Sequence, residues 1–235
     1  MLKTGAQQIG INLSENQINQ FMLYKDILVE WNKKINLTTI VDDDEIIKKH
    51  FLDCITIAKS VDLSKVNTLI DVGTGAGFPG IVIKIICPNI KVTLVDSLNK
   101  RIKFLNVVIQ ELGLENIECI HSRAEDLGKN PSYREKFDLC ASRAVAQLAV
   151  LSEYTLPFVK VGGTLVALKG PSIEEELPTG KKAINILGGK LDKIIDITVP
   201  FTQLNHKIVT IKKVRHTDKI YPRQAGLLKK NPLGQ

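Results

Sequence analysis

The stretch LIDVGTGAGFPG, residues 69–80, decides the fold of this 235-residue chain. An apolar run ends at Asp71 and is followed at once by four glycines, Gly73, Gly75, Gly77 and Gly80. Glycines permit positive φ angles and let the backbone approach a nucleotide-like ligand closely. Pro79 is tolerated in the first turn of a following helix. The stretch therefore predicts a buried strand, a ligand-binding turn and a helix.

Strand and helix patterns alternate after this stretch. Strand patterns lie at 66–72, 92–95, 117–120, 137–141 and 163–169, and helical patterns at 78–86, 100–112 and 147–159. Segments 194–199 and 208–214 resemble a final hairpin-like edge. This alternation predicts an α/β fold with a doubly wound, mostly parallel, Rossmann-like sheet, whose ligands bind at the carboxyl ends of its strands.

The first 65 residues predict a helical extension. Ser14 and Gln17 have the spacing of a capping box, and apolar residues then recur at helical spacing as far as Trp31. The acidic run 42–45 suits the positive end of a second helix, which continues to Ala58. We therefore divide the chain into an extension, 1–65, and a ligand-binding domain, 66–235. Periodicity leaves open whether the extension covers the ligand or docks a substrate.

Composition narrows the functional class. The apolar stretches are interrupted by charge before the roughly 18 residues that a membrane span requires, and the polar N-terminus lacks the apolar core of a signal peptide. We therefore expect a cytoplasmic protein without a membrane partner. The cysteines form no C-x-x-C pair, which favours reduced thiols over a metal site or a disulfide framework.

The net charge of +7 is concentrated at the C-terminal end. In residues 201–235 the only acid is Asp218, and the basic residues are Lys207, Lys212, Lys213, Arg215, Lys219, Arg223, Lys229 and Lys230. Such a density of positive charge attracts polyanions through phosphate contacts and counterion release. The alternative is a basic tail that is merely solvated. The segment therefore indicates a polyanionic substrate only together with the glycine motif.

The acids around the glycine motif separate two nucleotide cofactors. The G-x-G-x-x-G pattern at 75–80 is weak evidence for NAD by itself. Asp96 at the end of the second strand suits the ribose diol that both NAD and S-adenosylmethionine carry. It is also suited to capping the next helix. Asp71 favours S-adenosylmethionine (SAM), because a carboxylate there suits the ammonium of a methionine moiety better than a pyrophosphate. Glu125, after the third strand, suits adenine binding or is an ordinary surface acid.

Several motifs together resemble the RsmG family, also called GidB. They are Asn36-Leu-Thr-Thr39, His50-Phe-Leu-Asp53, the 71–80 loop, Asp96-Ser-Leu-Asn-Lys-Arg101, Arg123-Ala-Glu125, Ser142-Arg-Ala144, Lys169-Gly170 and the terminal Tyr221-Pro-Arg223 with Gly226, Lys229 and Pro232-Leu233. The resemblance spans nearly the whole chain, and Cys54 stands where a serine is expected. It implies a class I SAM-dependent methyltransferase that acts on N7 of a guanine in bacterial 16S ribosomal RNA (rRNA), alone or in the small subunit, and releases S-adenosyl-L-homocysteine.

The resemblance also implies site residues. With the residues argued above, the expected cofactor contacts are Asp71, Gly73, Gly75, Gly77, Phe78, Asp96, Ser97, Leu98, Ala124, Glu125 and Arg143. From their charge and from the stacking ring of Tyr221, we expect RNA contacts at Lys100, Arg101, Lys169, Arg215, Tyr221, Arg223, Lys229 and Lys230. Lys100 and Arg101 suit an ordinary helix surface equally well. Arg143 is the best candidate for a catalytic role, whereas His50 reads more readily as a packed core histidine. We expect a monomer without an obligate protein partner.

Guanine N7 carries a lone pair and no proton, so its methylation needs alignment and exclusion of water rather than a general base. The chain also lacks an Asn-Pro-Pro-aromatic tetrapeptide and a Pro-Cys pair, which are used on exocyclic amines and on pyrimidine C5. The alternatives are an NAD-dependent oxidoreductase, a non-catalytic ribosome-assembly factor with a SAM fold, and a SAM methyltransferase with another substrate.

Overall fold

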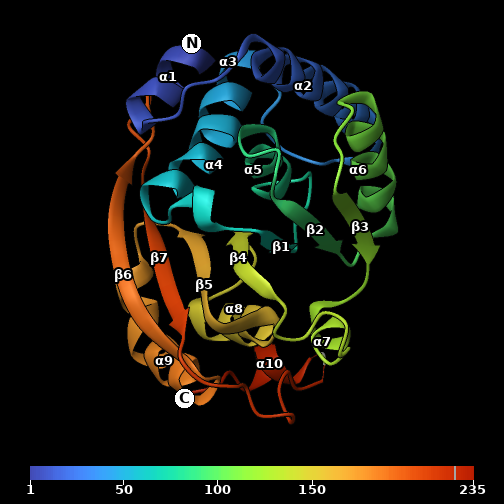
Figure 1. Ribbon diagram of the computed structural model, residues 1–235. Helices are drawn as coiled ribbons and strands as arrows, with labels where there is room; N and C mark the ends of the chain where they lie inside the picture. The colour runs from blue at the N-terminus through green and yellow to red at the C-terminus, as the bar shows by residue number, and fades with distance from the viewer. Residues whose placement is uncertain (225) are drawn as a thin grey trace.

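A computed structural model describes residues 1–224 and 226–235, with all their side chains except that of Lys229. Its centre is a seven-stranded sheet of order β3-β2-β1-β4-β5-β7-β6 (Figure 1). The strands are β1 (Thr68–Val72), β2 (Lys91–Asp96), β3 (Ile117–His121), β4 (Phe137–Arg143), β5 (Val159–Lys169), β6 (Gly189–Thr198) and β7 (Asn205–Lys213). The first five in chain order are parallel, and the β6–β7 hairpin adds two antiparallel strands beside β5. This confirms the predicted mostly parallel sheet and its terminal hairpin.

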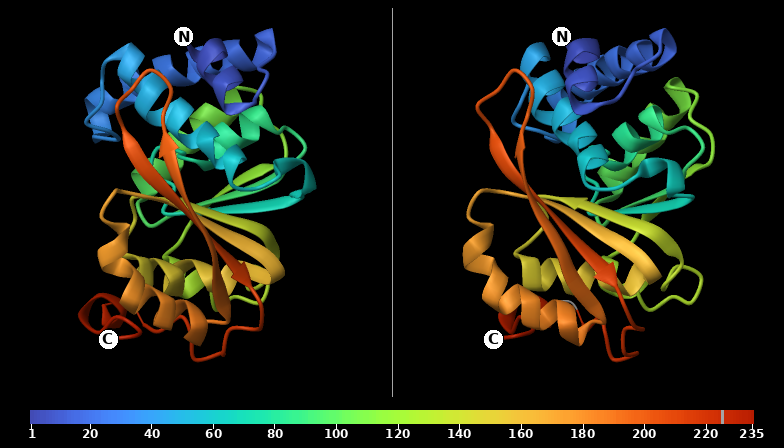
Figure 2. Two further views of the ribbon diagram at one scale, coloured as in Figure 1. Left: turned by 90° about the vertical axis from the view of Figure 1, so that its left-hand side faces the viewer. Right: turned by 60° about the vertical axis from the view of Figure 1, so that its left-hand side comes forward.

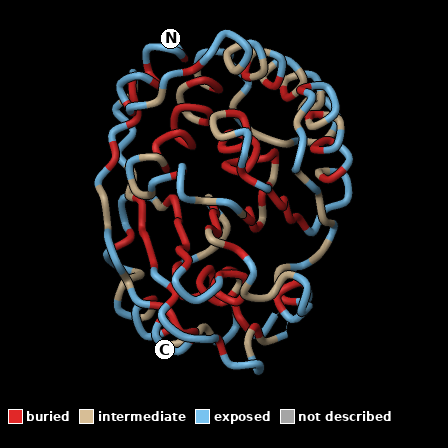
Figure 3. The backbone as a smooth tube through the Cα atoms, in the orientation of Figure 1, coloured by how far each residue is buried: buried red, intermediate tan, exposed pale blue. Residues whose placement is uncertain are grey.

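Helices cover both faces of the sheet, so most residues of the central strands β1 and β4 are buried (Figure 3). On one face lie α5 (Gly80–Ile86), α6 (Asn99–Glu111) and the N-terminal helices, and on the other lie α8 (Leu148–Thr155) and α9 (Ile173–Ile186) (Figures 1 and 2). Successive residues of β1 serve opposite faces, since Leu69 belongs to the first hydrophobic cluster and Ile70 to the second. Burial on both faces explains why β1 reads as a continuous apolar run.

The N-terminal extension is helical, as predicted. Helix α2 (Glu15–Ile35) begins with the capping box of Ser14 and Gln17. The second helix runs as α3 (Asp43–Ile46), a π-helical turn (Ile47–Leu52), α4 (Asp53–Ile55) and a 3₁₀ turn (Thr56–Lys59). Its apolar side chains join those of α5 and α6 in one hydrophobic cluster, so the boundary at residue 65 separates two patterns of secondary structure but not two cores.

Two helices of eight or more residues were not predicted from the sequence, and each contains a residue of low helix propensity. Helix α1 (Leu2–Ile9) contains Gly5, where a Cβ atom would lie 2.5 Å from Leu52 Cδ1. Helix α9 contains Pro178 and also Gly180, whose position packs against a side chain of α8. Close packing between helices therefore outweighs the local cost of these residues. The remaining short elements are a 3₁₀ turn (Leu63–Lys65), α7 (Ala124–Leu127), a 3₁₀ turn (Leu156–Phe158) and α10 (Leu227–Lys230).

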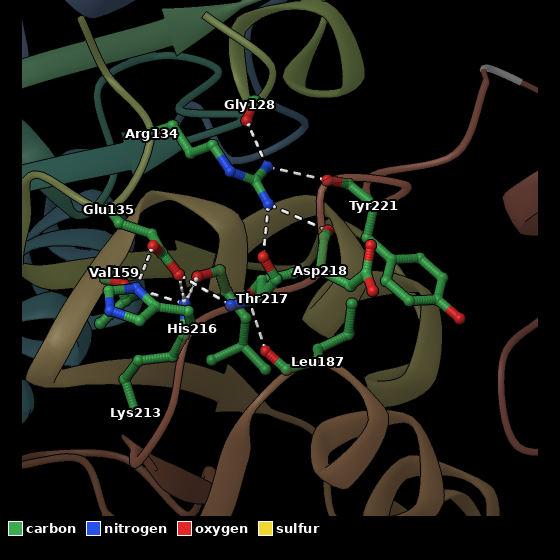
Figure 4. A network of polar contacts seen from close by, with 11 residues as sticks. Gly128, Arg134, Glu135, Val159, Leu187, Lys213, His216, Thr217, Asp218 and Tyr221 are labelled. Atoms are coloured by element: carbon green, nitrogen blue, oxygen red, sulfur yellow. Dashed lines mark hydrogen bonds and ion pairs between the residues drawn. The ribbon is translucent and has the colours of Figure 1, made fainter. Parts of the chain in front are cut away.

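The basic C-terminal segment is anchored to the turn before β4 (Figure 4). Arg134 donates hydrogen bonds of 2.8–3.0 Å to four carbonyl oxygens, those of Gly128, Thr217, Asp218 and Tyr221. Glu135 accepts from the Thr217 N–H at 2.8 Å and pairs with Lys213 Nζ at 2.9 Å. Burial alone would raise the pKa of Glu135, but these partners and His216 lower it to about 2. Glu135 therefore compensates the charge of the buried Lys213, which charge counting had assigned to the basic tail.

A second anchor binds Arg223, which we predicted to contact RNA. Its guanidinium makes a two-pronged ion pair with Glu153 of α8, with Nη2 to Oε2 at 2.7 Å and Nε to Oε1 at 2.9 Å. The Glu153 side chain is 1% exposed, and the Arg223 side chain 21%. Much of the charge of Arg223 is therefore matched inside the protein.

None of the helices in the described part of the chain has the length and apolar character needed to span a membrane.

The Arg223–Glu153 pair generates a stability prediction. Replacing Arg223 with alanine should lower the free energy of unfolding by about 3 kcal/mol, because Glu153 is left as an uncompensated buried charge. The exposed Lys219 is the matched control, and Lys219→Ala should change that free energy by less than about 0.5 kcal/mol. Urea denaturation followed by circular dichroism measures both. Equal effects of the two changes would show that the pair does not anchor the segment.

Candidate cofactor and substrate site

The glycine motif forms the turn between β1 and α5. Gly73, Gly75 and Gly77 have φ angles of 72°, 63° and 96°, which a side chain would strain. A Cβ atom at Gly73 would lie 2.8 Å from Val145 Cγ2, whereas one at Gly75 would meet nothing within 4 Å. The turn therefore packs tightly on one side and opens to a ligand on the other.

Asp71 lies beneath this turn. Its Oδ2 accepts hydrogen bonds from Thr74 Oγ1 and from the Gly80 N–H, both at 2.7 Å. The side chain is fully buried, and its Oδ1 has no hydrogen-bond partner among the described residues. Burial raises the pKa of Asp71 to about 7, although the two hydrogen bonds oppose the shift. We expected this carboxylate to meet a methionine ammonium, but in the structure it holds the turn from inside and lines neither cavity described below.

A cavity of about 290 Å³ opens at the carboxyl ends of β1, β2 and β3. Its lining includes predicted cofactor residues from three separate segments, namely Gly73, Asp96, Ser97, Ala124 and Glu125. Six lining residues were not among the predicted cofactor contacts: Val72, Val95, Ser122, Arg123, Val145 and Tyr154. The first five lie within or next to the quoted motifs, whereas Tyr154 carries no motif of its own.

Asp96 is buried at the rim of this cavity, between the glycine turn and α6. Its carboxylate accepts from the N–H groups of Gly75 (3.0 Å) and Leu98 (2.9 Å) and from Arg101 Nη1 (3.1 Å). Leu98 is 42% exposed at the start of α6 and contributes its backbone rather than a lining side chain. Asp96 therefore ties the turn to α6, and Arg101, predicted to contact RNA, is its counterion.

A second cavity of about 550 Å³ adjoins the first and shares Gly73 with it. The glycine turn contributes Gly75 and Phe78, and the N-terminal extension contributes Thr38, Lys49, His50 and Asp53. Strands β4, β5 and β7 add Arg143, Lys169 and His206, and the turn before β7 adds Leu204. The N-terminal extension thus forms a wall of this cavity.

Arg143 is the centre of a polar network in the second cavity. Its Nη1 lies 2.9 Å from Asp53 Oδ2 and donates to the Lys49 carbonyl at 3.0 Å. Its guanidinium also lies over the Phe78 ring, 4.8 Å from the ring centre. Arg143 therefore joins β4 to the extension and to the glycine turn, as a cation paired with a carboxylate.

His50 completes this network. Its Nδ1 lies 3.2 Å from Arg143 Nη2, and its Nε2 lies 2.8 Å from Thr38 Oγ1. Nδ1 also lies 3.1 Å from the carbonyl oxygen of Lys49, so each ring nitrogen has a hydrogen-bond partner whichever of them carries the proton. Burial, helped by the charge of Arg143, lowers the pKa of His50 to about 4. His50 is thus a neutral, hydrogen-bonded and buried histidine, as the sequence analysis favoured.

The predicted RNA-binding residues fall into two groups. Arg101 and Lys169 line the second cavity, where Lys169 also pairs with Glu176 at 2.8 Å. Lys100 is exposed beside Arg101 on α6. The others belong to the C-terminal segment and line neither cavity: Arg215, Tyr221, Arg223 and Lys230. The side chain of Lys229 lies outside the described residues.

Comparison with known proteins gives a consistent result over nearly the whole chain. The model of the GidB family, described as rRNA small subunit methyltransferase G, matches residues 17–219. Proteins described as Ribosomal RNA small subunit methyltransferase G, from Clostridium botulinum (strain 657) and Clostridium perfringens (strain 13), are 54% and 52% identical over 233 residues. Each alignment covers 99% of this chain and 98% of the relative.

Solved structures support the fold. An rRNA methylase from Streptococcus thermophilus has a TM-score of 0.51 and 15% identity, covering 68% of this chain and 96% of its own. TrmN from Thermus thermophilus also has a TM-score of 0.51, with 16% identity, covering 72% of this chain and 53% of its own. At this level of identity, the likeness concerns the Rossmann-like methyltransferase fold alone.

The glycine turn is also held from behind by Tyr24 of α2. The Tyr24 ring is fully buried 5.5 Å from the Phe78 ring, and its hydroxyl donates to the Ala76 carbonyl within the turn. Burial raises the pKa of Tyr24, so the hydroxyl stays protonated and keeps donating. The extension therefore fixes the turn as well as walling the second cavity.

Replacing Tyr24 with phenylalanine should weaken SAM binding by about tenfold, because the Ala76 carbonyl loses its donor while the ring packing is kept. Isothermal titration calorimetry measures the affinity. Tyr133→Phe is the matched control, because Tyr133 packs against the cluster on the opposite face and should leave the affinity unchanged. Unchanged SAM affinity in Tyr24→Phe would show that the hydroxyl does not set the shape of the turn.

Proposed function

Because this chain belongs to the GidB family, described as rRNA small subunit methyltransferase G, we propose that it transfers a methyl group from SAM to N7 of a guanine in 16S rRNA. The observation that carries the proposal is the pair of adjoining cavities that share Gly73 at the carboxyl ends of the parallel strands. One cavity has the size and acids for a nucleoside, and the other has room and cations for a base with its phosphate. The reaction would take place in the cytoplasm.

The residues of the first cavity fit the adenosine part of SAM. Asp96 offers a buried carboxylate for the ribose hydroxyls, and Glu125, 7% exposed at the start of α7, offers one for the adenine edge. Gly75 leaves open space where the turn approaches the ligand. The methionine part would extend past Gly73 toward Phe78 and Arg143. SAM supplies an electrophilic methyl group.

The residues of the second cavity suit methylation of a nitrogen that carries no proton. His50 is neutral, with both ring nitrogens in hydrogen bonds, and Arg143 is paired with Asp53. Neither has to remove a proton, because guanine N7 presents a lone pair directly. The residues of this chain would align the base and exclude water, which lowers the barrier without proton transfer.

Substrate binding would rely on the cations near the second cavity. Lys49, Arg101 and Lys169 line it, and Lys100 lies beside Arg101. The exposed Arg215 and Lys230 and the partly buried Tyr221 would extend the contact along the C-terminal segment, whereas Arg223 is committed largely to Glu153. Phosphate contacts of this kind bring a strong salt dependence to RNA binding.

The cofactor assignment is tested by Asp96→Ala. The loss of a buried carboxylate that binds two hydroxyl groups should weaken SAM binding at least tenfold, measured by calorimetry, with a correspondingly smaller thermal shift on adding SAM. Asp126→Ala, which removes an exposed acid on α7, is the control and should bind SAM normally. If Asp96→Ala binds SAM as tightly as the unchanged protein, the ribose role is wrong. Stabilisation by NADH instead of SAM would favour an oxidoreductase.

The activity is tested with labelled SAM and small-subunit rRNA from cells that lack their own copy of this enzyme. We expect a single new 7-methylguanosine, identified by nuclease digestion and mass spectrometry. Both free rRNA and assembled small subunits should be tried. Absence of transfer to either, despite SAM binding, would move the proposal to another substrate. Tight RNA binding without any transfer would favour a non-catalytic assembly factor.

A further inference from the structure

His206 has no role in the function proposed above, yet its ring lines the second cavity. It lies at the start of β7, where Ile197 of β6 is its partner and the next residue, Lys207, pairs with Lys169 of β5. Since Lys169 is the last residue of β5, His206 lies just beyond the carboxyl end of that strand. It therefore belongs to the edge of the sheet where ligands bind.

Asp53 fixes the orientation of this histidine. His206 Nδ1 lies 2.8 Å from Asp53 Oδ1, and the other oxygen of the same carboxylate pairs with Arg143. Burial alone would raise the pKa of Asp53, but the hydrogen bond from His206 and the charge of Arg143 lower it, so the carboxylate stays ionised. An ionised carboxylate only accepts, so Nδ1 carries a proton and donates it to Asp53.

The opposite nitrogen of the ring is left without a partner. His206 Nε2 is buried and makes no hydrogen bond to any of the described residues. In a neutral ring whose proton is on Nδ1, this atom carries a lone pair and is an acceptor. Buried polar atoms are normally hydrogen-bonded, so an unpartnered nitrogen in a residue that lines a cavity indicates a ligand that supplies its partner.

The position of His206 points to the substrate rather than to the cofactor. The strands β4 and β5 separate β7 from β1, which carries the glycine turn. Three steps of about 4.8 Å put the two strands about 14 Å apart. The cofactor residues cluster around β1, β2 and β3, whereas His206 lies on the far side of the second cavity.

We propose that His206 recognises the target base by accepting a hydrogen bond at Nε2 from the N1–H and N2 amino edge of guanine. This inference rests on the proposed function. With N7 directed toward the methyl donor, O6 and N7 are acceptors, and the donors of guanine lie on its N1 and N2. Adenine presents an acceptor at N1 and has no amino group at C2. A buried acceptor facing that edge would reject it, because a site built to bind a donor discriminates strongly against bases that lack one.

Two variants separate the functions of the two ring nitrogens. His206→Asn puts an amide near the place of Nδ1, so it keeps a donor for Asp53 and loses the acceptor at Nε2. His206→Gln puts its amide oxygen near the place of Nε2. We expect kcat/KM on the guanine substrate to fall at least tenfold in His206→Asn and about threefold in His206→Gln, with the dissociation constant of SAM unchanged in both. His216→Asn is the control, because the His216 side chain is 82% exposed and lines neither cavity, and it should retain normal kcat/KM.

The decisive measurement compares substrates in which the target guanine is replaced by inosine, which lacks the N2 amino group, or by 1-methylguanine, which lacks N1–H. The unchanged protein should prefer guanine over at least one of them by about tenfold. His206→Asn should reduce that preference to about twofold or less. An unchanged preference against both analogues, or a loss of SAM affinity equal to the loss of rate, would overturn the proposal.

The activity of the unchanged protein on the guanine substrate distinguishes a failure of this inference from a failure of the proposed function. If it forms no 7-methylguanosine, the proposed function fails, and the role of His206 falls with it. If it forms 7-methylguanosine and His206→Asn does so at the same rate, only the role of His206 is wrong.

Discussion

The hydrogen bonds of the buried Asp71 carboxylate are the constraint on which both cavities depend. One oxygen binds Thr74 and the Gly80 N–H, so the turn after β1 is closed from inside the protein. Position 80 has no room for a side chain, because a Cβ atom there would lie 2.3 Å from Leu94 Cδ2 and 2.9 Å from the same carboxylate oxygen. With its inner side fixed in this way, the turn presents Gly73 and Gly75 outward, between the two cavities.

The second cavity depends on a charge pair that joins distant parts of the chain. Asp53 of the extension binds Arg143 of β4 through one oxygen and His206 of β7 through the other. Taking such charges out of water is costly, and a buried pair adds little stability compared with apolar side chains. Its contribution here is positional, because it sets the orientation of three polar side chains around one cavity.

The sheet and the nucleotide-binding edge could be predicted because they leave local signals. Strands buried on both faces read as apolar runs, and the turn at 73–77 requires glycine. Tyr24 and His206 could not be predicted, since each acts through a contact with a residue far away in the sequence. Charge counting assigned Arg223 to RNA because it cannot reveal Glu153, which lies 70 residues away in the chain and 2.7 Å away in space.

The place of β6 at the edge of the sheet has a consequence for the behaviour of the protein in concentrated solution. An edge strand offers unpaired backbone groups to other chains and can seed aggregation. In β6 the exposed positions carry charges of both signs, Lys190, Asp192, Lys193 and Asp196. A second strand that paired there would have to strip water from these side chains. The hairpin therefore ends the sheet with a border that resists growth into fibrils.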